Sequence, residues 1–301
     1  MTTQTLRELV SRLTLSTTAL AALGAALDAR LGGRRLDPAL GARVADVLGS
    51  LGVGSAVAEA SPEELRPLRG EIRTHALAGA RLLASHAAGW SHTEAELLDA
   101  AGDVSAALPA RLAGEVVPSL DGLAERLTSP GARFLDVGTG VAVLAVEMAR
   151  RWPALRITGI DPWEPALARA AARVRGAGLA DRIELRRQAA EALDDEAAFD
   201  LAWIPGIFVP EGALAGAIHR VHRALRPGGW LVMAALAADG DSLDAAVFRL
   251  RTAMFGGAVT TARSVEARLR GEGMIDVRAL PAQPGAFTAL LVARRSPEDR
   301  S

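Results

Sequence analysis

The residues whose types and spacing most clearly suggest chemistry are an acid and two glycines near the middle of this chain. The stretch Phe134 to Gly140 reads as a short apolar strand that contains Asp136 near its end and is followed by Gly138 and Gly140. An apolar-periodic helix begins immediately afterwards. Glycines at a strand-to-helix turn let the backbone pass close to a ligand, because no Cβ stands in the way.

A second acid strengthens this interpretation. The predicted strand Arg156 to Asp161 ends in a carboxylate 25 residues after Asp136, where an acid can accept hydrogen bonds from ribose hydroxyls. The spacing therefore predicts a cofactor that contains adenosine. A dinucleotide fingerprint would need a third glycine at a position that is occupied by Val143. Asp136 is also a poor neighbour for a pyrophosphate and a good one for an ammonium group.

The order Asp-x-Gly-x-Gly followed by a strand-end acid resembles class I S-adenosylmethionine-dependent methyltransferases. Further segments extend the resemblance over residues 130–295. They are a third strand in Asp181 to Gln188, a fourth in Phe199 to Trp203, and the turn into a fifth in Leu225 to Val232. Two positions depart from the family pattern. Ala142 stands at the third glycine of the turn, and Gln188-Ala189-Ala190 stands where many members have an acid.

The resemblance implies a set of cofactor contacts. Asp161 is the expected ribose ligand, although it could also cap the helix that follows Pro162. Asp136 is expected to orient the glycine turn or to reach the cofactor amine through water, and Trp163 could lie against adenine or pack in the core. Gln188 or the backbone would contact adenine. The residues expected to bind S-adenosylmethionine are Asp136, Gly138, Thr139, Gly140, Asp161, Pro162, Trp163, Gln188, Ala189 and Trp203.

The loop after the fourth strand, Trp203 to Glu211, usually faces both the methyl donor and the acceptor in that family. Here the loop is apolar. It lacks the Asn/Asp-Pro-Pro-aromatic pattern of enzymes that methylate exocyclic amines, the acid of metal-dependent enzymes, and the His-Asp pair of plant-type enzymes. We expect an apolar or aromatic acceptor in contact with Ile204 and Phe208, with simple packing as the alternative. No catalytic residue is assigned and no metal is expected. Glu211 and His219 could act as bases, but they suit a helix start and a solvated helix face better.

Composition excludes several classes of function. The chain has 301 residues, a formal net charge of −1 and no cysteine. This charge balance does not favour nucleic acid or an anionic membrane as a partner, and the lack of cysteine excludes disulfides and thiolate chemistry. No uninterrupted apolar run reaches the roughly 18 residues of a membrane span. An apolar stripe beginning at Leu6 indicates an amphipathic N-terminal helix rather than a signal peptide, so we expect a cytoplasmic protein.

Helical periodicity almost without strand signals fills residues 1–129, and strands alternate with helices over residues 130–301. The pattern predicts an all-helical N-terminal domain followed by an α/β, Rossmann-like sheet that is mostly parallel. The last two strands, near 275–280 and 286–294, have a link too short for a parallel crossover, so they must be antiparallel if they pair. The helical domain resembles, more loosely, the dimerisation and substrate-covering domains of bacterial small-molecule methyltransferases. Its apolar stripes, such as Leu6, Leu9, Val10 and Leu13, predict a homodimer.

The function expected from the sequence is metal-independent methylation of a small molecule by S-adenosylmethionine. Oxygen is the commonest acceptor atom in the enzymes that the chain resembles, and secondary metabolism is the context that the resemblance implies. Two alternatives stay open. One is a protein or RNA methyltransferase whose helical domain docks a macromolecule. The other is a catalytically idle scaffold that binds the cofactor.

Overall fold

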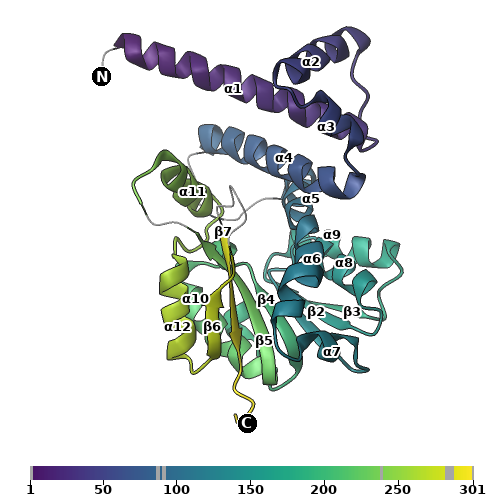
Figure 1. The fold of residues 1–301 in the computed structure, drawn as a ribbon, viewed down its shortest axis with the longest axis vertical. Coiled ribbons are helices and arrows are strands. Elements are labelled where there is room, and N and C mark those ends of the chain that lie inside the picture. The colour runs from purple at the N-terminus through teal and green to yellow at the C-terminus, as the bar shows by residue number, and fades with distance from the viewer. Residues whose placement is uncertain (1–2, 86–88, 90–92, 238–239, 282–287, 300–301) are drawn as a thin grey trace. The chain divides into compact units, whose positions relative to one another are not determined.

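The protein forms two compact units in a computed structural model that describes residues 3–85, 89, 93–237, 240–281 and 288–299. The first unit contains Met1–Ala80 and Ala95–Ala107 and is helical. The second contains Arg81–Glu94 and Leu108–Ser301 and holds the sheet. Figure 1 shows the elements of each unit.

Within the described residues, seven strands form one sheet in the order β3-β2-β1-β4-β5-β7-β6. The first five strands pair in parallel, while β7 pairs antiparallel with both β5 and β6. The predicted mixed sheet and its antiparallel end are therefore confirmed. The strands are β1 (Arg133–Val137), β2 (Arg156–Asp161), β3 (Ile183–Arg187), β4 (Phe199–Ile204), β5 (Leu225–Leu236), β6 (Ile275–Ala279) and β7 (Thr288–Arg294).

Helices cover both faces of this sheet, which explains why its central strands are apolar on both sides. One hydrophobic cluster joins β1 and β2 to the helices α8 (Val143–Arg151) and α9 (Glu164–Gly176). A second cluster joins β1, β4 and β5 to α10 (Glu211–Ala224) and α12 (Ala262–Gly271) on the opposite face. This double cover leaves the carboxyl ends of the parallel strands as the edge where a ligand can bind.

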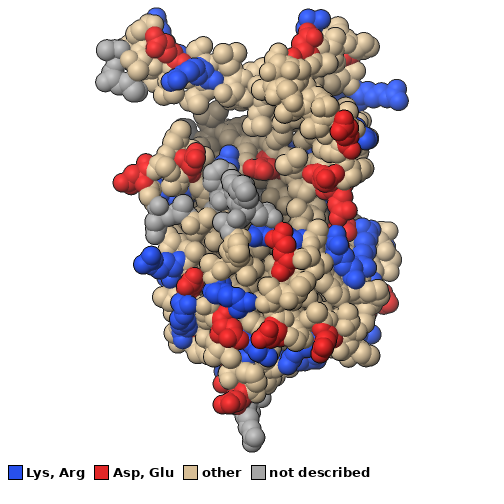
Figure 2. Space-filling view, viewed as in Figure 1, with Lys and Arg blue, Asp and Glu red and all other residues tan. Residues whose placement is uncertain are grey.

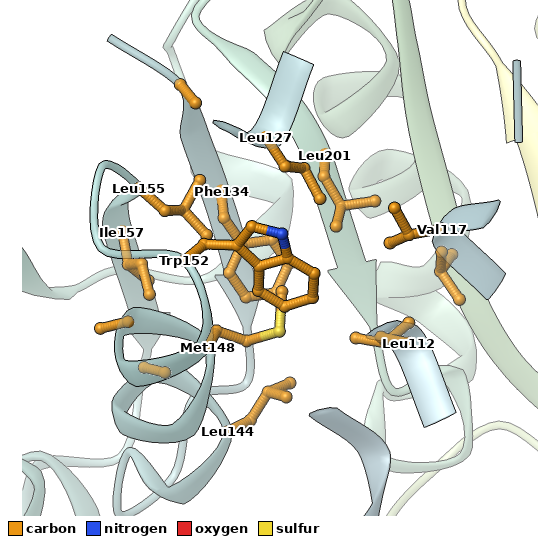
Figure 3. Packing of buried hydrophobic residues seen from close by; sticks show 14 of the residues in the cluster. Leu112, Val117, Leu127, Phe134, Leu144, Met148, Trp152, Leu155, Ile157 and Leu201 are labelled. Atoms are coloured by element: carbon orange, nitrogen blue, oxygen red, sulfur yellow. The ribbon is translucent and has the colours of Figure 1, made fainter. Parts of the chain in front are cut away.

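The predicted domain boundary near residue 129 lies too late in the chain. The short helices between Leu108 and Thr128 belong to the sheet unit, because Leu112, Leu123 and Leu127 are completely buried in the same cluster as Phe134. Figure 3 shows Leu112, Val117 and Leu127 around the same packed centre as Phe134, Met148 and Trp152. These helices are α6 (Leu108–Arg111), the π-helix η2 (Leu112–Val116), η3 (Val117–Ser119) and α7 (Leu123–Thr128).

Partly buried ion pairs and one close crossing hold the helical unit together. Asp103 accepts hydrogen bonds from Arg66 and Arg69, and Asp28 accepts one from Arg73. Gly70 allows close packing, since a Cβ there would lie 2.8 Å from the carbonyl oxygen of Ala100. The elements are α1 (Thr3–Arg30), α2 (Pro38–Ser50), α3 (Gly54–Glu59), α4 (Pro62–Ser85, which continues into the second unit), α5 (Ala95–Val104) and η1 (Ser105–Ala107).

Helix α1 keeps most of its apolar side chains exposed within the chain. Leu6, Val10, Leu13 and Leu15 are each about half exposed or more, while Leu27 is buried. By length and composition, the helix is also able to cross a membrane. The sequence did not predict this, because it contains no uninterrupted apolar run of roughly 18 residues. One such helix near the N-terminus is weak evidence for a span. What the structure does establish is an apolar helix surface that its own chain leaves uncovered.

Candidate cofactor and acceptor site

The turn between β1 and α8 adopts the backbone that its glycines predict. Gly138 has a φ of 64° and Gly140 a φ of 55°, in the left-handed region that glycine enters without steric cost. Ala142 has a φ of 60° and is fully buried, and its N–H donates to the carbonyl oxygen of Thr139 at 2.8 Å. The third position of the turn therefore has the left-handed backbone that favours glycine, but the residue there is Ala142.

Asp136 lies beneath this turn and fixes it. Its Oδ2 accepts a hydrogen bond of 2.7 Å from the hydroxyl of Thr139, whose N–H donates to the carbonyl oxygen of Ile160. Gly159 makes room for that arrangement, since a Cβ there would lie 2.8 Å from Thr139 Oγ1. Gly159 was not singled out from the sequence. A glycine inside a predicted strand, which often marks a close backbone approach, was the available signal.

Asp161 joins the ends of β1 and β2. Its Oδ2 accepts a hydrogen bond of 2.9 Å from the N–H of Gly140, and its Oδ1 accepts one of 2.8 Å from the N–H of Trp163. The carboxylate therefore holds the glycine turn and the chain entering α9 at once. Each oxygen retains acceptor capacity beyond these bonds, so that a ribose hydroxyl could be bound in addition.

Both acids at this edge of the sheet have a pKa above the ordinary value of an aspartate. Burial, and to a smaller extent the nearby charge of Asp161, raise the pKa of Asp136 to about 7 against the opposing effect of the Thr139 hydrogen bond. Burial also raises the pKa of Asp161, against the opposing effect of the Trp163 and Gly140 hydrogen bonds. A cation placed between them would favour the charged form of both acids. The pair thus suits a ligand that carries an ammonium or sulfonium group.

The remaining predicted cofactor residues lie along the same edge. Trp203 stands opposite Asp136 in the register of β1 and β4 and is partly exposed. Pro162 is exposed and Trp163 is partly exposed after β2. Gln188 and Ala189 follow β3, and the side-chain amide of Gln188 donates 2.9 Å to the carbonyl oxygen of Ala192, which ends the 3-10 turn η4 (Ala190–Ala192). The structure therefore brings all of these residues to the carboxyl ends of β1 to β4.

One of the two predicted acceptor contacts requires correction. Ile204 is completely buried in the core at the end of β4, because it packs toward the face that α10 and α12 cover, so it has no surface for an acceptor. Phe208, in the short helix η5 (Gly206–Phe208), is 42% exposed. Its ring packs against the ring of Phe255 in a T-shaped arrangement with a centroid separation of 5.6 Å. Phe208 remains the acceptor candidate on this loop.

The two candidate bases have structural partners. Glu211 begins α10, accepts a hydrogen bond from Thr260 at 3.0 Å and pairs with Arg268 at 3.0 Å. His219 lies 3.0 Å from Glu272 and is about half exposed. Within the described ranges, no group of three potential metal ligands is placed to hold an ion. The geometry thus supports ligand binding and alignment more directly than it supports a proton relay.

A glycine turn and a strand-end acid on a mixed sheet of this order define a class I methyltransferase fold. Residues 134–229 match the family model described as a methyltransferase domain. The predicted methyltransferase domain is therefore confirmed over these residues of the sheet unit.

Solved structures share the fold over the whole chain. An O-methyltransferase family protein from Burkholderia thailandensis has a TM-score of 0.66 at 15% identity, with 99% of each chain covered. Mitomycin 7-O-methyltransferase has a TM-score of 0.62 at 19% identity, covering 97% of this chain and 98% of its own. Human N-acetylserotonin methyltransferase, solved with S-adenosylmethionine, has a TM-score of 0.65 at 15% identity, with 97% of each chain covered.

Proposed function

We propose that this protein transfers a methyl group from S-adenosylmethionine to an oxygen of a small apolar or aromatic metabolite. The observation that carries this proposal is the exposed Phe208 ring on the loop after β4, which packs against the ring of Phe255. An aromatic pair on the loop that we assign to the acceptor would favour a flat apolar molecule, because stacked or edge-on rings gain contact energy beyond their buried area.

The charge distribution supports a small acceptor over a nucleic acid. On the face of the sheet unit shown in Figure 2, arginines are interspersed with aspartates and glutamates and form no basic stripe. The formal net charge is −1. Proteins that bind nucleic acid gather positive charge along one surface. The names of two proteins with this fold, mitomycin 7-O-methyltransferase and N-acetylserotonin methyltransferase, also refer to small molecules.

The residues of this chain would act by binding and alignment. S-adenosylmethionine, when bound, supplies an electrophilic methyl group on a sulfonium. Asp161 would accept hydrogen bonds from the ribose while it holds Gly140, and the buried Asp136 would place negative charge near the cofactor amine. Phe208 would orient the acceptor and exclude water from the line of transfer. An acceptor hydroxyl that is already acidic needs no protein base, and metal is not required for this step.

We also infer a homodimer formed through the helical unit, which would have dimerisation and substrate-covering roles in the cytoplasm. The exposed apolar side chains of α1 support this inference, since a surface of this kind is rarely left open in a soluble monomer. A second copy is the proposed partner because cyclic pairing buries the same face on both chains.

The test is transfer of a labelled methyl group to a matched panel of acceptors. Phenol and 2-naphthol vary the apolar area at constant chemistry, aniline replaces oxygen with nitrogen, and bulk tRNA and an unfolded protein represent the macromolecular alternatives. We expect transfer to the phenols, faster for 2-naphthol. Transfer to tRNA or protein with none to the small molecules would refute the proposal.

A further inference from the structure

The loop after β4 is held between two neighbouring backbones. On the cofactor side, Pro205 packs on Gly138, where an added Cβ would lie 3.2 Å from Pro205 Cγ. On the other side, Gly257 packs on Ile207, where an added Cβ would lie only 1.7 Å from the carbonyl oxygen of Ile207. The loop that carries Phe208 is therefore confined from both directions.

The second contact comes from the first part of the segment that connects α11 (Leu243–Met254) to α12. In this connector, Phe255–Ala258, the would-be Cβ of Gly257 also lies 2.4 Å from the carbonyl carbon of Ile207 and 3.0 Å from the N–H nitrogen of Phe208. All three atoms belong to the backbone, so no rotamer change could relieve the contact. Gly257 thus sets how closely the connector can approach the loop.

Two further contacts fix the loop to the same connector. The N–H of Ala258 donates 2.8 Å to the carbonyl oxygen of Val209, just after Phe208. The ring of Phe255, which is only 5% exposed, supports the ring of Phe208. The loop's own hydrogen bonds are short-range, from Phe208 to Pro205 and from Val209 to Gly206. The loop also packs directly on β5, where an added Cβ at Gly206 would lie 2.6 Å from the carbonyl oxygen of Ala234. The connector therefore fixes the loop from the side opposite to Gly138, in addition to this contact with the sheet.

We propose that the connector Phe255–Ala258 positions the acceptor loop, with Gly257 as the positioning residue that determines where Phe208 stands. This inference rests on the proposed function, because it assigns Phe208 to the acceptor side. Gly257 itself is not among the residues assigned to the cofactor or the acceptor. A larger residue there would displace Ile207 and Phe208 and disturb the acceptor, while the glycine turn and Asp161 continue to bind the cofactor.

The experiment compares Gly257→Ala with Gly212→Ala in the full-length protein. Gly212 is a matched control, since it lies in the first turn of α10 directly after the loop and an added Cβ would meet nothing within 4 Å. Hydrogen exchange is measured with S-adenosylhomocysteine bound, and affinity for that ligand is measured by calorimetry. Gly257→Ala should speed exchange of the amides of Phe208, Val209 and Ala258 by about tenfold or more and change ligand affinity by less than about threefold.

Turnover of 2-naphthol supplies the functional readout. Gly257→Ala should lower kcat/KM for 2-naphthol by about 10- to 100-fold, the effect of a misplacement of about 1 Å, with KM for S-adenosylmethionine unchanged. Gly212→Ala should match the wild type in every measurement. If Gly257→Ala does not fold, Phe255→Leu replaces it, with the smaller expectation that exchange at Phe208 rises and the 2-naphthol KM increases.

The outcomes separate this inference from the proposed function. Unchanged exchange at Phe208 and Val209 in the connector variant would overturn the positioning role, whatever the turnover. Faster exchange with unchanged kcat/KM for 2-naphthol would show that the connector holds the loop but that the loop is not the acceptor side, which also overturns the inference. A third outcome is that the wild type methylates no small acceptor, while Gly257→Ala still speeds exchange at Phe208 and Val209. The proposed function would then be wrong. The connector would still hold the loop, but its inferred role in acceptor binding would be refuted.

Discussion

Replacing Asp136 with asparagine should stabilise the ligand-free protein and weaken its cofactor binding. Asp136 is 2% exposed, and burial raises its pKa from 3.8 to about 7. Asparagine has nearly the same shape, carries no charge, and can still accept the hydrogen bond from the Thr139 hydroxyl. The substitution therefore removes the cost of a buried charge without opening a cavity.

The magnitude and the sign of the stability difference follow from the pKa values of Asp136 in the folded and unfolded states. Because the folded-state pKa is raised, the folded protein holds this proton more tightly than the unfolded chain does. The resulting stability is fully present below about pH 4 and is lost as the pH rises toward 7. At about 1.4 kcal/mol per pKa unit, the loss is on the order of 2 kcal/mol at pH 5 and on the order of 4 kcal/mol above pH 7. The advantage of Asp136→Asn should grow over this pH range.

Urea unfolding of both proteins between pH 4 and pH 8.5 measures this difference. Asp200→Asn is the contrasting control, because Asp200 is also buried but accepts a 2.6 Å hydrogen bond from Arg226. Removing the Asp200 charge should destabilise the protein by about 1.5–3 kcal/mol, because a hydrogen bond to a charged group is lost. An Asp136→Asn advantage that does not vary with pH would refute the reasoning. Equal affinity of the Asp136→Asn variant and the wild type for S-adenosylmethionine would remove Asp136 from the cofactor site.

Four other predictions test separate parts of the account. Asp161→Ala should weaken S-adenosylmethionine binding by about 1.5–3 kcal/mol, the cost of losing hydrogen bonds to a charged acceptor, and unchanged affinity by calorimetry would exclude it as a ribose ligand. Turnover should survive EDTA, and activity lost in chelator and restored by magnesium would show that metal independence is wrong. Leu127→Ala should destabilise the sheet unit by about 2–5 kcal/mol in urea unfolding because Leu127 is fully buried, whereas a change under 1 kcal/mol would place the boundary near residue 129 after all. Sedimentation of the full chain should give a dimer and of Leu13→Glu a monomer, while a monomeric wild type, or one that binds neutral lipid vesicles through α1, would refute pairing of this helix with a second copy.

The parts of the fold that sequence predicted well are those in which local pattern and function coincide. Strand-end acids with glycines between them located Asp136 and Asp161, and the structure brings both to one edge. The short link before β7 required an antiparallel end, and β6 and β7 pair in that way. Such features depend on residues close together in the chain, so the sequence carries the information directly.

The errors arose where the partner of a segment is distant in sequence. Helical periodicity between Leu108 and Thr128 shows that these residues have an apolar face, but not that the face packs on Phe134 rather than on the preceding helices. Ile204 and Phe208 are both apolar residues near one strand end, and only the three-dimensional fold decides that the first is buried. Gly257 could not be recognised as important, because its contact is with a loop 50 residues earlier, at Ile207.

The central claim is that the carboxyl edge of β1 to β4 binds S-adenosylmethionine. Calorimetric titration of the full-length protein with S-adenosylmethionine, S-adenosylhomocysteine and a nicotinamide dinucleotide tests it most directly, without added metal. We expect both S-adenosyl compounds to bind at one site per chain and the dinucleotide to show no measurable heat at the same concentrations. Tighter binding of the dinucleotide, or no binding of either S-adenosyl compound, would contradict the account.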